Sequence, residues 1–290
     1  MTDDDVRLHV EERGEGDPLL FIHEFAGDSR SWEPQLSHFS SRYRCIAYDA
    51  RGYAPSDVPD HVVAYSQARA VADAIAVLDG LGVRRAHVVG LSMGGFCALH
   101  LGLRDPERVR SLVVAGVGYG AHPDAQERFR HESAAVAAAF RAEGAAEVAK
   151  RYAVGPARVQ LQNKNPEAWS EFAAALGGHS AVGAALTMLG VQSRRPSLYD
   201  LRGELATLAV PTLILAGDED DGCIETGLML KRTIPASGLA LLPRTGHTCN
   251  LEEPERFNDA LEHFLAAVAA RRWTARDPRS LSASMTGIDK

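Results

Sequence analysis

The most constraining feature of the chain is the sequence Gly-Leu-Ser-Met-Gly at residues 90–94. The mostly apolar residues 86–89 predict a buried strand before it, and residues 95–101 predict the start of a helix after it. A strand, a tight turn and a helix are the setting in which G-x-S-x-G holds a serine as a nucleophile. Glycine is needed on both sides because a β-carbon there would collide with the neighbouring strand or helix. The pattern therefore predicts a strained Ser92, with its hydroxyl at the carboxyl edge of a sheet and beside a helix N-terminus.

A serine hydroxyl is a poor nucleophile without a base, and the base needs an acid that orients it. Both follow later in the chain, after predicted strands. Residues 211–217 predict a buried strand that leads into the acidic run 218–221. Residues 239–242 predict a further short strand, which leads into His247. The order serine, acid, histidine is the chain order of α/β-hydrolases.

On these motifs the chain resembles the α/β-hydrolase superfamily over roughly residues 6–270. The resemblance implies that Ser92 is the nucleophile and that His247, in a G-H-x-x-x-x-E-x-P segment, is the base. It selects Asp220 as the acid, through a G-x-x-D motif that begins at the glycine ending the preceding strand. Asp218 is the alternative acid, and otherwise pins the loop.

An acyl-transfer site also needs two backbone N–H groups that stabilise the developing oxyanion. One is expected from Met93, directly after the nucleophile. The resemblance to an H-G-x-x-G segment after strand 18–22 makes Phe25 the second donor, and implies that His23 shapes this loop rather than acting as a second base. Glu24 departs from the pattern because it replaces the usual glycine. We expect it either to adopt an unusual backbone shape at a cost or to change the loop. It also adds a carboxylate near the site, unless it points into solvent.

Strands that alternate with helices predict an α/β fold, with a mainly parallel sheet flanked by helices. Residues 6–10 alternate between apolar and polar and predict an edge strand. The resemblance implies an α/β-hydrolase core over residues 1–120 and 202–270. Between them, residues 121–201 are Ala-rich and predict helices, and the resemblance implies that these form an inserted helical cap over the active site. Residues 271–290 predict a loosely ordered tail.

The cap is expected to supply much of the substrate pocket. We predict substrate contacts from Trp169 and Met188, together with Glu24 from the loop after the first buried strand. The alternative for each cap residue is packing within the cap itself. Other large cap side chains that could reach the pocket are Phe140, Tyr152, Phe172 and Leu189.

Composition narrows the class of function. The formal net charge of −7 does not favour binding to nucleic acid or to an anionic membrane surface. The acidic N-terminus lacks the features of a signal peptide and no apolar run is long enough to span a membrane, so we predict a cytoplasmic protein. The four cysteines have no paired spacing and are expected to be free thiols. No metal-ligand spacing, phosphate loop or dinucleotide fingerprint occurs, so we expect no metal and no cofactor.

The sequence therefore predicts a cofactor-free serine hydrolase that acts on a small molecule, a mostly apolar carboxylic ester or lactone. A first alternative is a carbon–carbon bond hydrolase of ring-opened aromatic keto-acids. Such sites add an arginine, for which Arg51, Arg194 and Arg195 are candidates without an assigned place. A second alternative is a non-catalytic ligand receptor on the same scaffold, with Glu24 disabling the oxyanion loop.

Overall fold

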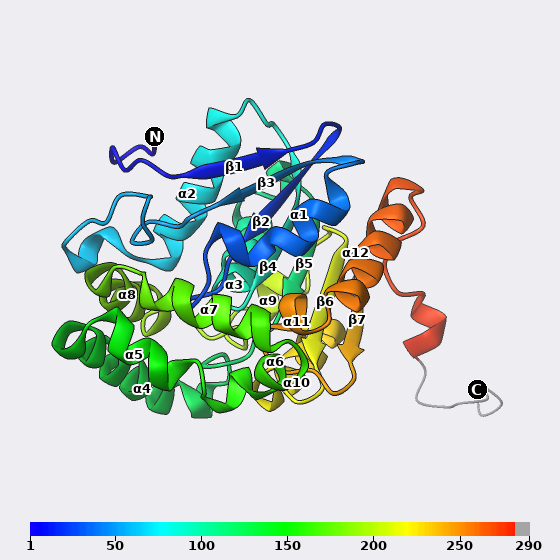
Figure 1. Cartoon of the computed structure of the whole chain (residues 1–290). Coiled ribbons are helices and arrows are strands. Elements are labelled where there is room, and N and C mark those ends of the chain that lie inside the picture. Colours follow the sequence, from blue (N-terminus) through cyan, green and yellow to red (C-terminus); the bar gives the residue numbers. More distant parts are fainter. Residues whose placement is uncertain (282–290) are drawn as a thin grey trace.

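The computed structural model describes residues 1–281 of the chain, in which seven strands form one sheet in the order β1-β3-β2-β4-β5-β6-β7 (Figure 1). The strands are β1 Val10–Arg13, β2 Asp17–Ile22, β3 Tyr43–Tyr48, β4 Ala86–Leu91, β5 Val109–Ala115, β6 Thr212–Gly217 and β7 Ser237–Leu242. Strand β1 pairs with β3 in antiparallel orientation, and every other neighbouring pair is parallel. The sheet is therefore the mainly parallel one that the sequence predicts.

The edge strand differs from its prediction. Residues 6–10 were expected to pair, but the ladder begins only at Val10. The preceding segment is held instead by the loop after β3: the N–H of Asp57 donates to the carbonyl of Arg7 at 2.9 Å, and the N–H of His9 donates to Ser56 Oγ at 2.8 Å. The alternating pattern thus correctly indicated an extended segment, but its hydrogen bonds go to a loop rather than to a strand.

The parallel strands are buried on both faces because successive side chains point to opposite sides of the sheet. Leu20 and Ile22 of β2 belong to the core on one face, where helices α2 and α3 pack. Leu19 and Phe21 of the same strand belong to the core on the other face, with helices α1 and α12. This explains why the strands appear in the sequence as nearly unbroken apolar runs.

The helices that flank the sheet are α1 Glu33–Phe39, α2 Gln67–Gly80, α3 Met93–Arg104, α9 Arg202–Leu205, α10 Asp221–Thr233, α11 Cys249–Glu252 and α12 Pro254–Ala269. Short 3-10 turns lie at Ser29–Trp32, Val62–Ala64, Pro106–Arg108 and Pro278–Leu281. Helix α2 begins after the N-cap Ser66, whose side chain accepts a hydrogen bond from the N–H of Arg69. These helices cover both faces and leave the carboxyl ends of the strands for the site.

A separate group of helices lies between β5 and β6, shown in green in Figure 1. Its members are α4 Pro123–Glu143, α5 Ala145–Tyr152, a 3-10 turn at Pro156–Arg158, α6 Val159–Lys164, α7 Pro166–Gly177, α8 Ala181–Thr187 and a π-helical turn at Met188–Gln192. Gly144 separates α4 from α5 with a φ of 83°, a conformation that glycine adopts readily. Its apolar core is built around Phe140, Leu161 and Leu176, and it continues into Phe25 and Met93 outside the group. We refer to these helices as the cap.

The predicted loose tail covers residues 271–290, of which 282–290 lie outside the described residues. In the described part, Trp273 is docked rather than loose. Its indole N–H donates to the carbonyl of Ala236 at 3.0 Å, and its ring packs edge-on against Phe264.

Within residues 1–281, no single helix has the length and apolar character needed to cross a membrane. Only the pair Pro166–Gly177 and Ala181–Gln192, bent by 94° at its break, meets that test jointly, by length and composition alone.

Candidate active site

Ser92 occupies the tight turn between β4 and α3. Its backbone has a φ of 52° and a ψ of −114°, an uncommon conformation for a residue with a side chain. Two hydrogen bonds fix the turn: the N–H of Ser92 donates to the carbonyl of Ala115 at 2.8 Å, and the N–H of Phe96 donates to the carbonyl of Ser92 at 2.9 Å. A β-carbon on Gly90 or Gly94 would lie 2.1 or 2.0 Å from a carbonyl oxygen. The flanking glycines are therefore required by packing, as the sequence pattern suggests.

His247 and Asp220 come together from two loops at the carboxyl ends of β7 and β6. His247 Nδ1 lies 2.7 Å from Asp220 Oδ2, and both residues are buried. Burial opposes ionisation of Asp220, but the charge and hydrogen bond of His247 hold the pKa of this carboxyl below its ordinary value. An ionised carboxylate can only accept, so Nδ1 carries the proton and donates it to Asp220. This tautomer leaves His247 Nε2 as the free basic atom.

The loop that carries His247 is fixed on both sides by Glu252. The N–H of Gly246 donates to Glu252 Oε2 at 2.6 Å, and the N–H of Thr248 donates to Oε1 at 3.0 Å. The alternative acid Asp218 is exposed, and its Oδ1 accepts from the N–H of Thr245 at 3.2 Å. Of the two candidate acids, Asp220 is thus the one in contact with His247, whereas Asp218 pins the loop.

The loop after β2 presents a free backbone donor beside the serine turn. His23 Nε2 accepts from the N–H of Ala50 at 3.0 Å, so Nδ1 must carry the proton that it donates to the carbonyl of Glu24 at 2.7 Å. Burial lowers the pKa of His23, which keeps this imidazole neutral. Among the described residues, neither the N–H of Phe25 nor that of Met93 has a hydrogen-bond acceptor. These are the two donors expected to form an oxyanion site.

Glu24 brings a carboxylate to the site, as expected unless it pointed into solvent, and it does so without the unusual backbone shape that was the other possibility. Its backbone is not among the described residues with positive φ, so it does not require glycine, and its side chain does not point into solvent. Its Oε2 instead accepts a hydrogen bond from Arg158 in the cap at 2.5 Å, with both side chains almost completely buried. Burial alone would lower the pKa of Arg158, but the Glu24 carboxylate raises it above its ordinary value. The unusual residue in the loop is therefore one half of a buried ion pair.

A cavity of about 340 Å³ lies between the core and the cap and contains both Ser92 and His247. Its remaining lining residues are Glu24, Phe25, Tyr119, Phe129, Glu132, Ser133, Val136, Tyr152, Gly155, Pro156, Ala157, Arg158, Met188, Gln192 and Arg195. Glu24 and Met188 are where the sequence placed them. Trp169, also predicted to contact substrate, is not in this lining: its indole N–H donates to the carbonyl of Ala153 at 2.6 Å within the cap, and that prediction is wrong.

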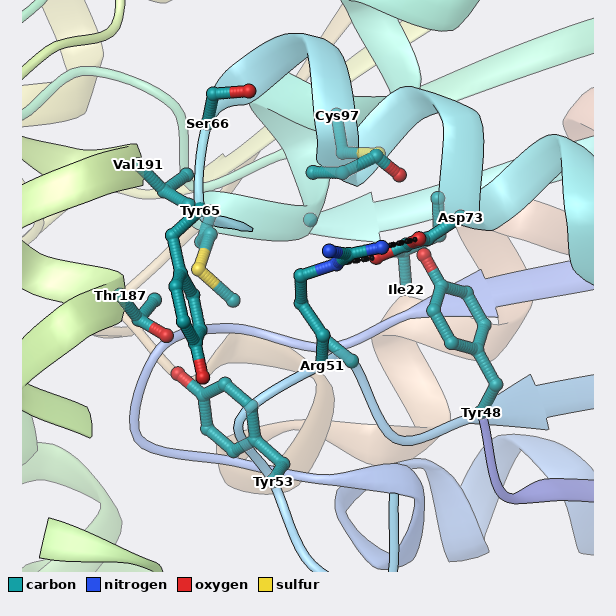
Figure 2. A pocket seen from close by; sticks show the side chains of 14 residues that line it. Ile22, Tyr48, Arg51, Tyr53, Tyr65, Ser66, Asp73, Cys97, Thr187 and Val191 are labelled. Atoms are coloured by element: carbon teal, nitrogen blue, oxygen red, sulfur yellow. Dashed lines mark hydrogen bonds and ion pairs between the residues drawn. The ribbon is translucent and has the colours of Figure 1, made fainter. Parts of the chain in front are cut away.

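A second, much smaller cavity of about 30 Å³ borders Met93 and Gly94 from another side. Figure 2 shows the guanidinium of Arg51 directed at Asp73 in this cavity, with Tyr53 and Tyr65 nearby. The volume suffices for about one water molecule and excludes an organic substrate. Arg51 therefore belongs to a structural ion pair and not to the cavity of Ser92.

One group of potential metal ligands occurs among residues 1–281. Ligand atoms of Asp220, Cys223 and His247 lie within 4.8 Å of one another, all buried. The direct hydrogen bond between Asp220 and His247 already uses Nδ1 of the imidazole and one oxygen of the carboxylate. Burial raises the pKa of the Cys223 thiol well above its ordinary value, which disfavours the thiolate that binds metal. The group fits an acid–base pair better than a metal centre.

Comparison with known proteins agrees with this architecture. Residues 17–254 match the family described as alpha/beta hydrolase fold. The chain belongs to this family. It is 28% identical over 251 residues to 3-oxoadipate enol-lactonase 1 of Acinetobacter baylyi, covering 86% of this chain and 89% of that protein. It is 30% identical over 278 residues to 2-hydroxymuconate semialdehyde hydrolase of Pseudomonas putida, covering 91% and 92%.

Solved structures include similar members of the alpha/beta hydrolase family. One is a thermophilic esterase from Thermogutta terrifontis, with a TM-score of 0.81 and 29% identity over 91% of this chain and 94% of that chain. Another is a hydrolase from Pseudomonas aeruginosa, with a TM-score of 0.80 and 29% identity over 92% and 97%. These similarities support a hydrolase activity, but they do not identify the substrate.

The sequence analysis missed or left unplaced several polar residues of the cavity, among them Arg158, Gln192 and Arg195. Arg158 lies in a single 3-10 turn between two cap helices, Gln192 ends the π-helical turn, and Arg195 follows it. None sits in a motif or on a periodic face, so no local pattern identifies them. The sequence does place Arg194 and Arg195 near the end of the cap, but it does not indicate which of the two points into the cavity. The structure separates them, because Arg194 is exposed and Arg195 is buried.

Proposed function

We propose that this protein is a serine hydrolase that cleaves a small carboxylic ester or lactone through an acyl-enzyme. The observation that carries the proposal is the 2.7 Å contact between His247 and Asp220, together with the strained Ser92 turn in the same cavity. A nucleophile, a base and an orienting acid are the minimum set for covalent acyl transfer.

The proposed reaction begins when Ser92 Oγ attacks the substrate carbonyl and His247 Nε2 takes the serine proton. The Asp220 carboxylate stabilises the resulting imidazolium and remains ionised. The N–H groups of Met93 and Phe25 bind the oxyanion of the tetrahedral intermediate. The intermediate collapses as the imidazolium returns its proton to the leaving oxygen, which forms the acyl-enzyme. Water, activated by the same imidazole, then adds to the acyl carbon and releases Ser92 and a carboxylic acid.

The substrate class follows from the cavity and from the relatives. A volume of about 340 Å³ suits a small molecule, and Phe25, Phe129 and Met188 give it apolar walls. Relatives of this chain include proteins named enol-lactonase and esterase, whose printed names describe lactone and ester substrates. An ester or lactone carbonyl needs only the groups assigned above, without a metal or a cofactor.

The proposal is tested by labelling with a fluorophosphonate probe. The wild-type protein should react at one site, with loss of p-nitrophenyl ester hydrolysis, because the reaction needs both an activated serine and an oxyanion site. Ser92→Ala should lose both labelling and turnover while keeping its thermal unfolding temperature. A folded wild-type protein that neither labels nor hydrolyses any ester would instead favour the ligand-receptor alternative.

A second candidate is hydrolysis of a carbon–carbon bond in a keto-acid. Arg195, buried in the cavity, is the observation that favours it, since such sites use an arginine to hold the acid. The relative named 2-hydroxymuconate semialdehyde hydrolase supports the same candidate. Turnover of vinylogous 1,5-diketones compared with p-nitrophenyl esters separates the two reactions: a higher kcat/KM for the diketone would replace the ester assignment.

A further inference from the structure

Glu24 brings an unpaired oxygen to the Ser92 cavity, although its carboxylate is half of a buried ion pair. Its Oε2 accepts from Arg158 at 2.5 Å, whereas its Oε1 accepts no hydrogen bond from the described residues. The two oxygens of a carboxylate offer about four acceptor sites, so one bond from Arg158 leaves most of them unfilled. An acceptor in a cavity with apolar walls is costly until a donor reaches it.

The ion pair meets the cavity through its carboxylate and not through its guanidinium. Nε and Nη1 of Arg158 are sealed from solvent and have no partner within residues 1–281, and the central carbon of the guanidinium lies 4.8 Å from the ring centroid of Phe172. Oε1 of Glu24 is not one of these sealed atoms, and Glu24 lines the same cavity as Ser92. A molecule in the cavity therefore meets an acceptor at this point rather than a donor.

The loop after β2 fixes this acceptor relative to the proposed oxyanion site. The carbonyl of Glu24 and the N–H of Phe25 belong to one planar peptide unit. That carbonyl accepts from His23 Nδ1 at 2.7 Å and from the N–H of Gly27 at 3.2 Å, which orients the N–H of Phe25. The hydroxyl of Tyr53 donates to the carbonyl of Phe25 at 2.7 Å and holds the next peptide unit. The carboxylate and the oxyanion donor thus come from adjacent residues of one rigid loop.

The charges of the cavity favour a neutral donor over a cation at Glu24. Arg158 already compensates the Glu24 carboxylate. Arg195 adds a buried guanidinium whose terminal nitrogens donate to neutral acceptors, the carbonyl of Tyr119 and the amide oxygen of Gln192. An ammonium group beside Glu24 would be repelled by both guanidinium groups. A hydroxyl or an amide N–H can donate to the open oxygen without adding charge.

We infer that Glu24 binds a neutral hydrogen-bond donor of the substrate, a hydroxyl or an amide N–H close to the scissile carbonyl. Because Phe25 is the next residue, a substrate whose carbonyl oxygen accepts from its N–H places the neighbouring carbons near the Glu24 side chain. The donor is therefore carried close to the ester group, on its acyl side or on its alcohol side. The inference rests on the proposed function, since it takes Ser92 as the attacking group.

The substrate class becomes narrower as a result. It is an ester or lactone with a hydroxyl or acylamino substituent beside the ester group. A hydrogen bond to an ionised carboxylate is stronger than one between neutral groups, and a site built around such a bond rejects analogues that lack the donor. The glycine that is usual at the position of Glu24 has no side chain with which to make this selection.

The test compares esters that differ in one hydrogen-bond donor. Methyl 2-hydroxybutyrate and methyl 2-methoxybutyrate differ on the acyl side, and 2-hydroxyethyl butyrate and 2-methoxyethyl butyrate differ on the alcohol side. Acid release in a pH-stat gives kcat/KM for each ester. The wild-type protein should favour the hydroxy member of at least one pair by about 10-fold or more. Equal kcat/KM values within both pairs, or a preference for the methoxy members, would overturn the inference.

The variant Glu24→Gln should reduce this preference to within about threefold, because its amide oxygen can accept from Arg158 while its NH₂ group faces the cavity. The matched control is Glu132→Gln, which alters an exposed carboxylate at the same cavity. It should keep the hydroxy-to-methoxy ratio within about twofold of the wild type. If Glu24→Gln fails to fold, Glu24→Leu/Arg158→Met replaces it, since this double variant leaves no unpaired charge. An unchanged preference in the folded variant would contradict the inference.

Binding without turnover separates failure of this inference from failure of the proposed function. NMR titration of Ser92→Ala with the four esters should give a lower Kd for the hydroxy member of the preferred pair, and Ser92→Ala/Glu24→Gln should lose this difference. If the wild-type protein hydrolyses none of the esters but the Glu24-dependent binding is present, the nucleophile assignment fails and the donor site stands. If esters are hydrolysed with no such difference in turnover or binding, the donor site fails and the hydrolase stands.

Discussion

Two buried arginines of the same cavity, Arg158 and Arg195, differ in one respect that determines what each does. Both side chains lie against two aromatic rings and are nearly inaccessible to solvent. Arg158 has a carboxylate, Glu24, at 2.5 Å, whereas Arg195 has only neutral acceptors. Burial without a counter-charge lowers the pKa of Arg195, while Glu24 overcomes the effect of burial and raises that of Arg158.

The comparison indicates that the paired arginine has a structural role, whereas the unpaired one has no carboxylate partner in the described part of the chain. Glu24 precedes Phe25, whose N–H is a proposed oxyanion donor, and Arg158 belongs to the cap. Their ion pair therefore joins the cap to the oxyanion loop. Arg51 is a second paired example, since Asp73 and Asp4 both accept its hydrogen bonds and hold its loop. Arg195 is the exception to this pattern, since it lines the cavity of Ser92 and its hydrogen bonds go to neutral acceptors.

The largest effect is expected from Arg158→Met, because it leaves the Glu24 carboxylate buried without a partner. Removal of one member of a buried ion pair costs about 3–5 kcal/mol of the free energy of unfolding. The double variant Glu24→Gln/Arg158→Met should recover much of that loss, since no uncompensated charge remains. Urea unfolding of the two variants and the wild type measures both quantities. If the free energies of unfolding of Arg158→Met and the wild type were equal, the structural role of the Glu24–Arg158 ion pair would be contradicted.

A second variant converts the paired arginine into an unpaired one. Glu24→Gln keeps an oxygen that can accept from Arg158 but removes the negative charge from the cavity. The ratio of kcat/KM for an anionic ester to kcat/KM for a neutral ester should then rise about tenfold, because a second uncompensated cation in the cavity attracts a negatively charged ester. This preference is measured as the ratio of the kcat/KM value for mono-p-nitrophenyl adipate to that for its neutral methyl ester. An unchanged ratio would mean that charge balance in the cavity does not control specificity.

A smaller effect is expected on stability from Arg195→Met. The substitution removes an uncompensated charge and fills the space between Phe96 and Phe129 with an apolar side chain. The free energy of unfolding should change by less than about 1 kcal/mol, because desolvation relief offsets the lost hydrogen bonds. Urea unfolding in the absence of substrate gives the value. A loss as large as that of Arg158→Met would show that both arginines are structural.

The smallest effect is expected at an ion pair that is only partly buried. Lys164 of the cap lies 2.6 Å from Glu253 of the core, with about a fifth to a quarter of each side chain exposed. Lys164→Met should cost no more than about 1 kcal/mol, and less at high salt, because solvent and ions screen the pair. Urea unfolding at low and high salt measures the contribution of the Lys164–Glu253 pair to the free energy of unfolding. The contribution of the buried Glu24–Arg158 pair, measured in the same way, should not change with salt.

The sequence predicted the parts of the molecule that local patterns encode. The glycines around Ser92 are required by contacts within the turn itself, and the parallel strands appear as apolar runs because both faces of the sheet are covered. The two loops that carry Asp220 and His247 follow strands, so their meeting at one edge of the sheet follows from the topology. The order of the strands was therefore enough to predict that Asp220 and His247 lie close together.

The cap could not be predicted to the same depth. Glu24 and Arg158 are 134 residues apart, and they meet because a single 3-10 turn of the cap packs on the loop after β2. No periodic pattern in the sequence indicates such a contact. Gly144 separates α4 from α5, which changes the faces that these two helices present. Trp169 was assigned to the pocket by its size, but its N–H found an acceptor within the cap. Side-chain direction in a short insertion depends on contacts that are distant in sequence.

The triad itself is tested most directly by comparing kcat for Asp220→Asn and Asp218→Asn on one p-nitrophenyl ester. Asp220→Asn should lower kcat on the order of 10⁴-fold, because an amide no longer holds His247 in the tautomer that leaves Nε2 basic. Asp218→Asn should lower it only a few-fold, since its side chain contacts the loop backbone and not the imidazole. A mild Asp220→Asn beside a severe Asp218→Asn would contradict the proposed assembly of Ser92, His247 and Asp220.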